Sequence, residues 1–189
     1  MPPRIVLASA SPRRRELLQQ IGVVFRVVVA EIVEQPVPGE LPGDFVLRMA
    51  REKAFDVMRR QADHLPVLGA DTAVILADRI LGKPASRSEA TEMLNSLSGK
   101  THEVFSAVAV AVSESEIFEA LNVSRVTFSE LEPEWIEAYI ESGDPMDKAG
   151  AYGVQGKAGE KISRIEGSFY GVMGLPLYET AQLLKRAGV

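Results

Sequence analysis

Apolar and polar residues alternate along the chain between strand-like and helix-like patterns, which is typical of an α/β protein. Short apolar or β-rich runs predict strands, and patterns bounded by capping residues, proline or glycine predict the helices between them. The predicted strands are residues 4–8, 23–29, 67–70, 73–76, 104–112, 117–128 and 161–165. The predicted helices are residues 12–21, 44–60, 86–98, 133–141 and 176–187, and residues 30–43 and 143–159 are predicted loops. The pattern and length predict one domain, residues 1–189.

The first predicted helix has an unusual first turn. Arg13, Arg14 and Arg15 follow the N-cap candidate Ser11. Exposed cations at the positive end of a helix dipole cost about 0.3–1 kcal/mol each, so a helix selected only for stability would carry acidic residues there. Either an anion such as phosphate binds at this turn, or the turn is solvated and pairs with Glu16 or other acidic neighbours. We favour the anion site, because several local rules are broken together.

Lys53 lies on the apolar side of the helix predicted over residues 44–60. The apolar stripe that it joins consists of Val46, Met49, Ala50, Ala54 and Val57. An ammonium group on this side either extends its stem to reach water, or pairs with a charge and lines a polar cleft. Helical geometry alone leaves both alternatives open.

Asp71 lies between two apolar runs that otherwise have the pattern of a buried strand. A carboxylate at such a position is rarely left unpaired. Because ligands of α/β sheets gather at strand ends, Asp71 could hold a divalent ion or orient a water molecule. The alternative is a turn formed by Asp71 and Thr72.

Glycine recurs at every third position at Gly150, Gly153, Gly156 and Gly159, over a stretch much too short for collagen. The spacing predicts a backbone segment that approaches a ligand closely, with Gln155 able to bond the edge of a base. The alternative is a flexible surface loop.

Composition narrows the chemistry further. The 189 residues include no cysteine and two histidines, which excludes thiolate nucleophiles, Fe–S clusters, cysteine-based zinc sites and a three-histidine zinc site. A metal would therefore lie among carboxylates, which favours Mg²⁺ or Mn²⁺. The net charge of −5 argues against general binding to nucleic acid. Neither a membrane-spanning apolar run nor a signal peptide is recognisable, so we expect no membrane partner and a cytoplasmic location.

One apparent phosphate motif fails. Ser98-Gly99-Lys100-Thr101 has the ending of a P-loop, but the glycine required five residues before Gly99 is replaced by Leu94. The motif also needs a strand before it and a helix after it, and the predicted order here is the reverse.

Seven short segments carry a further signal. They are residues 7–14 (LASASPRR), 50–54 (AREKA), 69–72 (GADT), 82–84 (GKP), 98–102 (SGKTH), 147–156 (DKAGAYGVQG) and 174–176 (GLP). Together they resemble the Maf family of nucleoside-triphosphate pyrophosphatases over nearly the whole chain. The first and sixth are the most specific, and the sixth is similar to the subgroup that acts on dTTP and UTP rather than on 7-methyl-GTP. Residues 169–173 and Ser106 depart slightly from the family's usual wording, which could tune base selectivity.

The resemblance implies a fold and an activity. The fold is an elongated mixed α/β sheet flanked by helices, with a central substrate cleft, as in inosine-triphosphate pyrophosphatases. The activity is hydrolysis of the bond between the α- and β-phosphates of dTTP or UTP, with Mg²⁺, Mn²⁺ or Co²⁺ as cofactor. It would clear surplus or non-canonical nucleotides. Dimers are common in the family, which makes a second copy of this chain a candidate partner.

The resemblance also implies roles for individual residues, which fall into three groups. The catalytic group is Asp71 as proton acceptor, with Lys53 and Lys83; the substrate-binding group is Ser9, Arg13, Arg14, Thr72 and Gln155; the metal group is Glu34 and Asp71. Within them, Arg13, Thr72 and Gln155 match specificity positions. The cations would neutralise the triphosphate and stabilise the leaving pyrophosphate.

Two alternatives stay open. Maf proteins are also linked to blocked septum formation, so the chain could be a regulator of cell division in which catalysis is incidental. It could also be a purine-directed enzyme acting on inosine or xanthosine triphosphate, against which Gln155 and its loop argue by resemblance.

Overall fold

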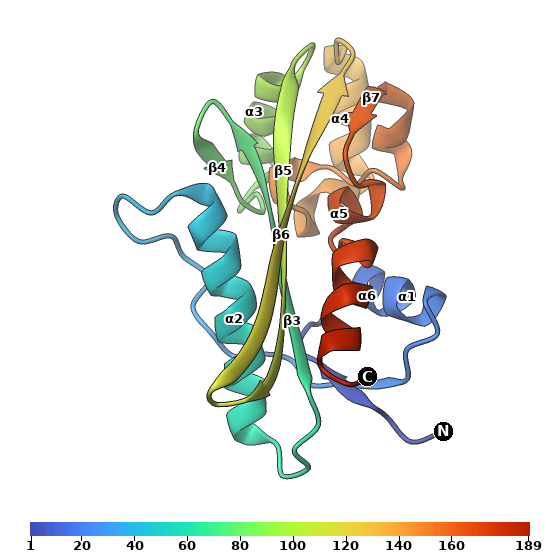
Figure 1. Ribbon diagram of the computed structural model, residues 1–189. Helices are drawn as coiled ribbons and strands as arrows, with labels where there is room; N and C mark the ends of the chain where they lie inside the picture. The colour runs from blue at the N-terminus through green and yellow to red at the C-terminus, as the bar shows by residue number, and fades with distance from the viewer.

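Seven strands form one elongated mixed sheet with helices on both faces in a computed structural model, which describes residues 1–189 (Figure 1). The strand order is β2-β1-β3-β5-β6-β7, and β4 also pairs with β3. β1 is parallel to β2 and β3, and the other pairs are antiparallel. The strands are β1 (Ile5–Leu7), β2 (Phe25–Val27), β3 (Val67–Leu76), β4 (Arg79–Leu81), β5 (Thr101–Ser113), β6 (Glu116–Phe128) and β7 (Ile162–Glu166). The predicted α/β class is confirmed.

The helices lie between these strands in the chain. The α-helices are α1 (Pro12–Gln20), α2 (Pro42–Arg60), α3 (Arg87–Leu97), α4 (Pro133–Glu141), α5 (Phe169–Met173) and α6 (Leu177–Arg186). Three short 3₁₀ helices follow α4: η1 (Asp144–Asp147), η2 (Ala149–Ala151) and η3 (Lys157–Lys161). The sequence pattern does not predict β4, α5 or these turns, because elements of three to five residues are too short to show a periodicity. The predicted strand over residues 23–29 is reduced to β2.

β3 runs through Asp71 and Thr72 without a break, so the interruption predicted there is wrong. Asp71 pairs with Ala107 of β5, and Thr72 pairs with Ser106, in the same register as their neighbours. The polar pair is therefore part of the strand and not a turn. Its side chains point to opposite faces of the sheet, because successive side chains of a strand alternate.

The edge of β3 that faces away from β5 is divided between two partners. β1 pairs with Val67 and Leu68, and β4 pairs with residues 74–76. Residues 69–73 have no strand on this edge, so the sheet opens here. Asp71 and Thr72 lie in this opening, which fixes the position of the cleft described below.

On the face of the sheet away from α2, the polar residues Thr72 and Ser106 separate the apolar core into two parts. One apolar cluster includes Leu68 and packs with α1 and α6, and a second includes Val74 and packs with α3 and α4. Between them Thr72 Oγ1 and the fully buried Ser106 Oγ are hydrogen-bonded at 3.1 Å. The polar positions of β3 and β5 thus separate two apolar cores and leave room for a site between them.

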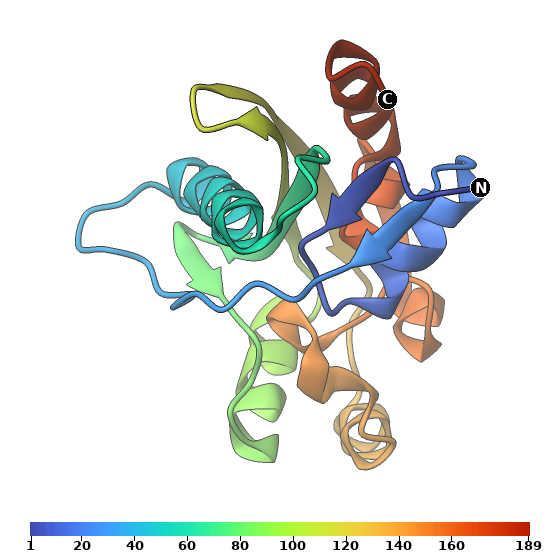
Figure 2. The same ribbon diagram turned by 90° about the horizontal axis from the view of Figure 1, so that it is seen from below.

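On the other face, α2 packs directly on β3. The predicted stripe of α2 is confirmed, since all five of its apolar residues are buried together with Lys53. A Cβ atom at Gly69 would lie only 2.1 Å from the Ala50 carbonyl oxygen, so only glycine permits this close approach. Figure 2 shows α2 nearly end-on, with the segment that precedes it projecting from the body of the molecule.

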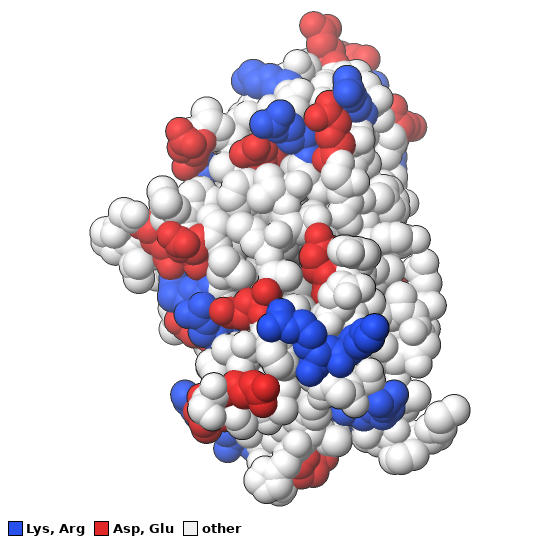
Figure 3. All heavy atoms as spheres, in the orientation of Figure 1, with Lys and Arg blue, Asp and Glu red and all other residues white.

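Charged side chains of both signs are interspersed over the face seen in Figure 3, and neither sign dominates it. None of the helices combines the length and the apolar character needed to cross a membrane.

His102 is a buried structural residue of β5, with 2% of its surface exposed. Its Nε2 is 2.7 Å from Tyr152 Oη, its ring stacks on Phe128, and its Nδ1 has no hydrogen-bond partner. Burial lowers the pKa of His102 to about 4. The imidazole is therefore neutral in the folded protein at pH 7.

The buried histidine predicts a loss of stability in mild acid. Below pH 6.5 the unfolded state binds a proton that the folded state does not bind until about pH 4, so the free energy of unfolding falls across this window. Between pH 7 and pH 5, His102 is expected to remove about 2 kcal/mol. Urea unfolding at both values measures it. His102→Gln should show a smaller loss, whereas exposed His64→Gln should match the wild type; equal losses in all three would contradict the assignment.

Candidate functional site

A cleft of about 750 Å³ opens where the edge of β3 is unpaired, between α1, α2, β4 and the segment that contains η1 and η2. Its volume is in the range that accommodates small-molecule ligands. All nine residues predicted for the site line it: Ser9, Arg13, Arg14, Glu34, Lys53, Asp71, Thr72, Lys83 and Gln155. They come from six separate segments, so the fold brings together residues that are far apart in the sequence.

At the centre of the cleft, Lys53 bridges two carboxylates. Its Nζ donates to Asp71 Oδ1 at 2.8 Å and to Glu34 Oε2 at 2.7 Å. The Lys53 and Asp71 side chains are 8% and 10% exposed, whereas Glu34 reaches in from the more exposed segment before α2. Of the two alternatives for Lys53, the structure shows the paired one. Asp71 Oδ2 makes no hydrogen bond within the chain, so one oxygen of this carboxylate is available to a ligand.

The same carboxylates are suitable ligands for a divalent cation. Both contact Lys53 Nζ, and each keeps an oxygen that Lys53 does not use. No group of three acidic or histidine side chains forms a cage for an ion. Mg²⁺ in phosphoryl-transfer sites commonly takes one or two carboxylates and completes its shell with substrate phosphates and water. Glu34 and Asp71 therefore fit such an ion when a phosphate substrate is present.

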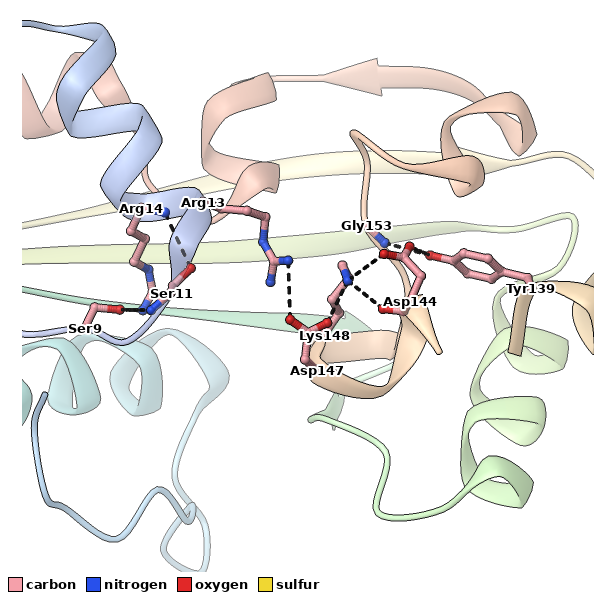
Figure 4. Close-up of polar contacts among 9 residues, drawn as sticks. All are labelled: Ser9, Ser11, Arg13, Arg14, Tyr139, Asp144, Asp147, Lys148 and Gly153. Atoms are coloured by element: carbon pink, nitrogen blue, oxygen red, sulfur yellow. Dashed lines mark hydrogen bonds and ion pairs between the residues drawn. The ribbon is translucent and has the colours of Figure 1, made fainter. Parts of the chain in front are cut away.

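Arg14 is locked into the wall of the cleft (Figure 4). Its guanidinium donates to the Gly174 carbonyl at 2.8 Å, to Ser9 Oγ at 3.2 Å and to Thr72 Oγ1 at 3.4 Å. Burial lowers the pKa of Arg14, and the nearby Asp71 and Glu34 carboxylates counteract part of that effect. Two of its N–H groups stay uncommitted, so Arg14 can hold Ser9 and Thr72 in place and still donate to an anion.

Arg13 points across the mouth of the cleft. Its guanidinium lies 3.6 Å from Asp147 Oδ2, an ion pair between α1 and η1 that Figure 4 shows. Arg15 turns away and donates to the Ala10 carbonyl at 3.0 Å. Glu16 pairs with none of the three arginines. Two of the three cations in the first turn of α1 therefore face the cleft, as the anion-site interpretation requires.

Lys83 and Gln155 line the cleft from two loops that are hydrogen-bonded to each other. The Gly150 N–H donates to the Gly82 carbonyl at 3.0 Å, which holds the turn carrying Lys83 against the glycine-rich segment. Gln155 is exposed on the lining of the cleft. A lysine and an amide thus line the cleft from two segments that are hydrogen-bonded to each other.

Three glycines of the repeat make room for the chain's own side chains. Close approach of this segment to a ligand stays a prediction. A Cβ at Gly150 would lie 2.9 Å from Val74, one at Gly153 would lie 2.7 Å from Lys148 Cε, and one at Gly156 would lie 3.0 Å from Asp144 Oδ2. The segment is also not a featureless loop, because η2 and η3 form part of it.

Charge in the cleft has the opposite sign to the net charge of the chain. Five cationic side chains line it against three carboxylates, a surplus of two positive charges in a chain of net charge −5. The cations are Arg13, Arg14, Lys53, Lys83 and Lys148, and the carboxylates are Glu34, Asp71 and Asp147. A polyanion such as a triphosphate is therefore favoured inside the cleft.

Among the lining residues that have no role assigned from the sequence are Asp147, Lys148 and Gly174. Asp147 and Lys148 lie in the highly specific segment 147–156, and this segment is the only sequence signal that points to them. The spacing within it does not show which of its side chains reach the cleft. Gly174 acts through its carbonyl group, which no residue-type pattern reveals.

Comparison with known sequences decides the family. Residues 4–187 match the family profile described as Maf-like protein. The chain belongs to the Maf family. It is 53% identical to a dTTP/UTP pyrophosphatase of Methylobacillus flagellatus, over 98% of this chain and 94% of that protein. It is 51% identical to a dTTP/UTP pyrophosphatase of Bordetella avium, over 99% of this chain and 96% of that one.

Among solved structures, a HAM1 protein of Coxiella burnetii matches this Maf chain with a TM-score of 0.52. The match covers 98% of this chain and all of that one at 18% identity, so it shows a shared fold. This similarity confirms the elongated mixed sheet with flanking helices that the resemblance implied.

Proposed function

We propose that this chain hydrolyses dTTP and UTP between the α- and β-phosphates, giving a nucleoside monophosphate and pyrophosphate, and so clears nucleotides from the cytoplasmic pool. The observation that carries the proposal is the cleft centred on the Lys53-bridged carboxylates. It lies in a chain about half identical, over nearly its full length, to proteins named dTTP/UTP pyrophosphatase.

Asp71 is the proton acceptor in this proposal. Its Oδ1 is held by Lys53, which fixes the carboxylate, and its Oδ2 is free to take a proton from a water molecule. Water activated in this way attacks a phosphorus atom, and the bond between the α- and β-phosphates breaks.

The cations position the triphosphate and stabilise the charge that develops on the leaving pyrophosphate. Three acceptors hold the Arg14 guanidinium in one position. The same hydrogen bonds fix the hydroxyl groups of Ser9 and Thr72. Arg13 and Lys83 also line the cleft. Such positioning supplies most of the catalysis in phosphoryl transfer, so the lack of a cysteine nucleophile is no obstacle.

A divalent cation, Mg²⁺, Mn²⁺ or Co²⁺, is part of the proposal. Glu34 and Asp71 would hold it, and when bound it would neutralise phosphate charge and polarise the phosphoryl oxygens. Gln155 would read the base edge through its amide group. Association with a second copy of the chain stays a prediction.

A panel of nucleoside triphosphates tests the proposal. Pyrophosphate release is measured from dTTP, UTP, CTP, dGTP, ATP, ITP and XTP, each with Mg²⁺, Mn²⁺ or Co²⁺ and with a chelator as control. We expect dTTP and UTP to be the best substrates and the chelator to abolish release. Preference for ITP and XTP would support the purine-directed alternative. Absence of pyrophosphate release from every nucleotide would reject the proposal that the chain is a nucleotide pyrophosphatase.

A further inference from the structure

A charged cluster beside the cleft has no part in the proposed reaction (Figure 4). At its centre is Lys148, whose side chain is 12% exposed although it lines the cleft. Its Nζ donates to the Asp144 carbonyl at 2.5 Å, to Asp144 Oδ1 at 3.0 Å and to Asp147 Oδ1 at 2.6 Å. An ammonium group has three donors, and all three are used. Lys148 therefore cannot bind a phosphate without giving up a bond inside the chain.

The glycine-rich segment that carries Gln155 is packed on this cluster. The stem of Lys148 fills the space beneath Gly153, where even a Cβ would collide with it, and the Asp144 carboxylate fills the space beneath Gly156. The backbone between these glycines is therefore supported by the side chains of Lys148 and Asp144. Gln155 lies within that supported stretch.

Tyr139 of α4 extends the support. Its hydroxyl donates to Asp144 Oδ2 at 2.8 Å and accepts from the Gly153 N–H at 3.2 Å. A chain of hydrogen bonds thus runs from the backbone at Gly153 through Tyr139 and Asp144 to Lys148. Burial opposes ionisation of Asp144, but hydrogen bonds from Lys148 and Tyr139 outweigh it and lower the pKa of the carboxyl. The carboxylate is therefore charged at neutral pH and bound to an ammonium.

The cluster also reaches the phosphate side of the cleft. Lys148 holds one oxygen of Asp147, and the other oxygen of Asp147 lies 3.6 Å from Arg13. One lysine is consequently connected both to the segment that carries Gln155 and to the arginine at the mouth.

We propose that Lys148 is a positioning residue that sets the geometry of Gln155 toward the base and, through Asp147, of Arg13 toward the phosphates. The inference rests on the proposed function and deepens it. Without the ammonium, Asp144 and Asp147 repel each other and the stem beneath Gly153 is no longer anchored to them, so the segment shifts. Discrimination between bases then declines while Asp71 and Lys53 remain intact.

Lys148→Met tests this against the matched control Lys157→Met, which removes an exposed lysine from the same segment. Displacing a binding group by about 1 Å can cost up to ~10²-fold. In Lys148→Met we therefore expect the preference for dTTP over dGTP in kcat/KM to fall about tenfold or more, mainly through the KM for dTTP. Lys157→Met should behave like the wild type. A lysine that only supports folding would lower kcat for both nucleotides equally and leave the preference unchanged, which would overturn the proposal.

A second readout does not depend on turnover. Amide hydrogen exchange at residues 149–156 should be faster in Lys148→Met than in Lys157→Met, because the acceptor for the Gly153 N–H is no longer held in place. Equal exchange in the two variants would overturn the proposal for Lys148, whether or not the wild type hydrolyses nucleotides. Absence of hydrolysis by the wild type would by itself reject only the proposed function. If Lys148→Met does not fold, Asp144→Asn replaces it in both measurements with the same expectations.

Discussion

Asp71→Asn is expected to lower kcat for dTTP by about 10²–10⁴-fold, the usual contribution of a general base. The asparagine oxygen can still accept from Lys53, and Lys53 keeps Glu34 as a second partner. The shape of the cleft and the cations that bind the triphosphate are therefore preserved. Steady-state kinetics should show the loss in kcat, and calorimetry should show that dTTP binds the variant within a few-fold of the wild type.

The control for this change is Asp78→Asn, the same chemical substitution in the exposed turn between β3 and β4. It lies outside the cleft and should leave both kcat and KM unchanged. Retention of full activity in Asp71→Asn would remove Asp71 from the role of proton acceptor. Equal loss of binding and turnover would instead mean that the carboxylate organises the cleft and does no proton transfer.

The fold class was predictable because its longer elements carry strong periodic signals. The α2 stripe has the helical period over many residues, and β5 and β6 are long β-rich runs. β4 and α5 were not predictable, because each depends on tertiary contacts: β4 exists as a strand only by pairing with residues 74–76.

The interruption predicted at Asp71 fails for a physical reason. A carboxylate and a hydroxyl in an apolar run indicate a turn when only local chemistry is considered. In the folded chain each has a partner from a distant segment, Lys53 of α2 for Asp71 and Ser106 of β5 for Thr72. A strand can therefore continue through polar positions when tertiary contacts satisfy them, and here those positions form the site.

Candidate site residues were predictable where they violated a local rule. The arginines of α1 oppose the helix dipole, and Lys53 lies on a buried face, so each required an explanation. Lys148 breaks no local rule in the sequence, and Gly174 contributes only backbone. Their roles depend on which segments meet in space, and residue order alone does not contain that information.

Gly69→Ala is expected to destabilise the protein by about 3 kcal/mol and to remove most activity. The added Cβ would lie 2.1 Å from the Ala50 carbonyl oxygen and 2.8 Å from the Ala54 backbone nitrogen, so the collision is with the backbone of α2 and no side chain can move to relieve it. α2 must shift away from β3. Because Lys53 lies between these two residues of α2, the shift moves its ammonium away from Asp71. Urea unfolding and dTTP kinetics measure the two effects.

Gly82→Ala is the control for stability, because a Cβ there meets nothing within 4 Å. It should unfold at nearly the wild-type urea concentration. The two effects at Gly69 are coupled through one rigid helix, so a larger side chain at this position should increase both losses together. Gly69→Val is therefore expected to be less stable and less active than Gly69→Ala. A Gly69→Ala variant with wild-type stability would show that α2 can move away from β3 at no cost in free energy. Close packing of α2 on β3 would then not explain the position of Lys53.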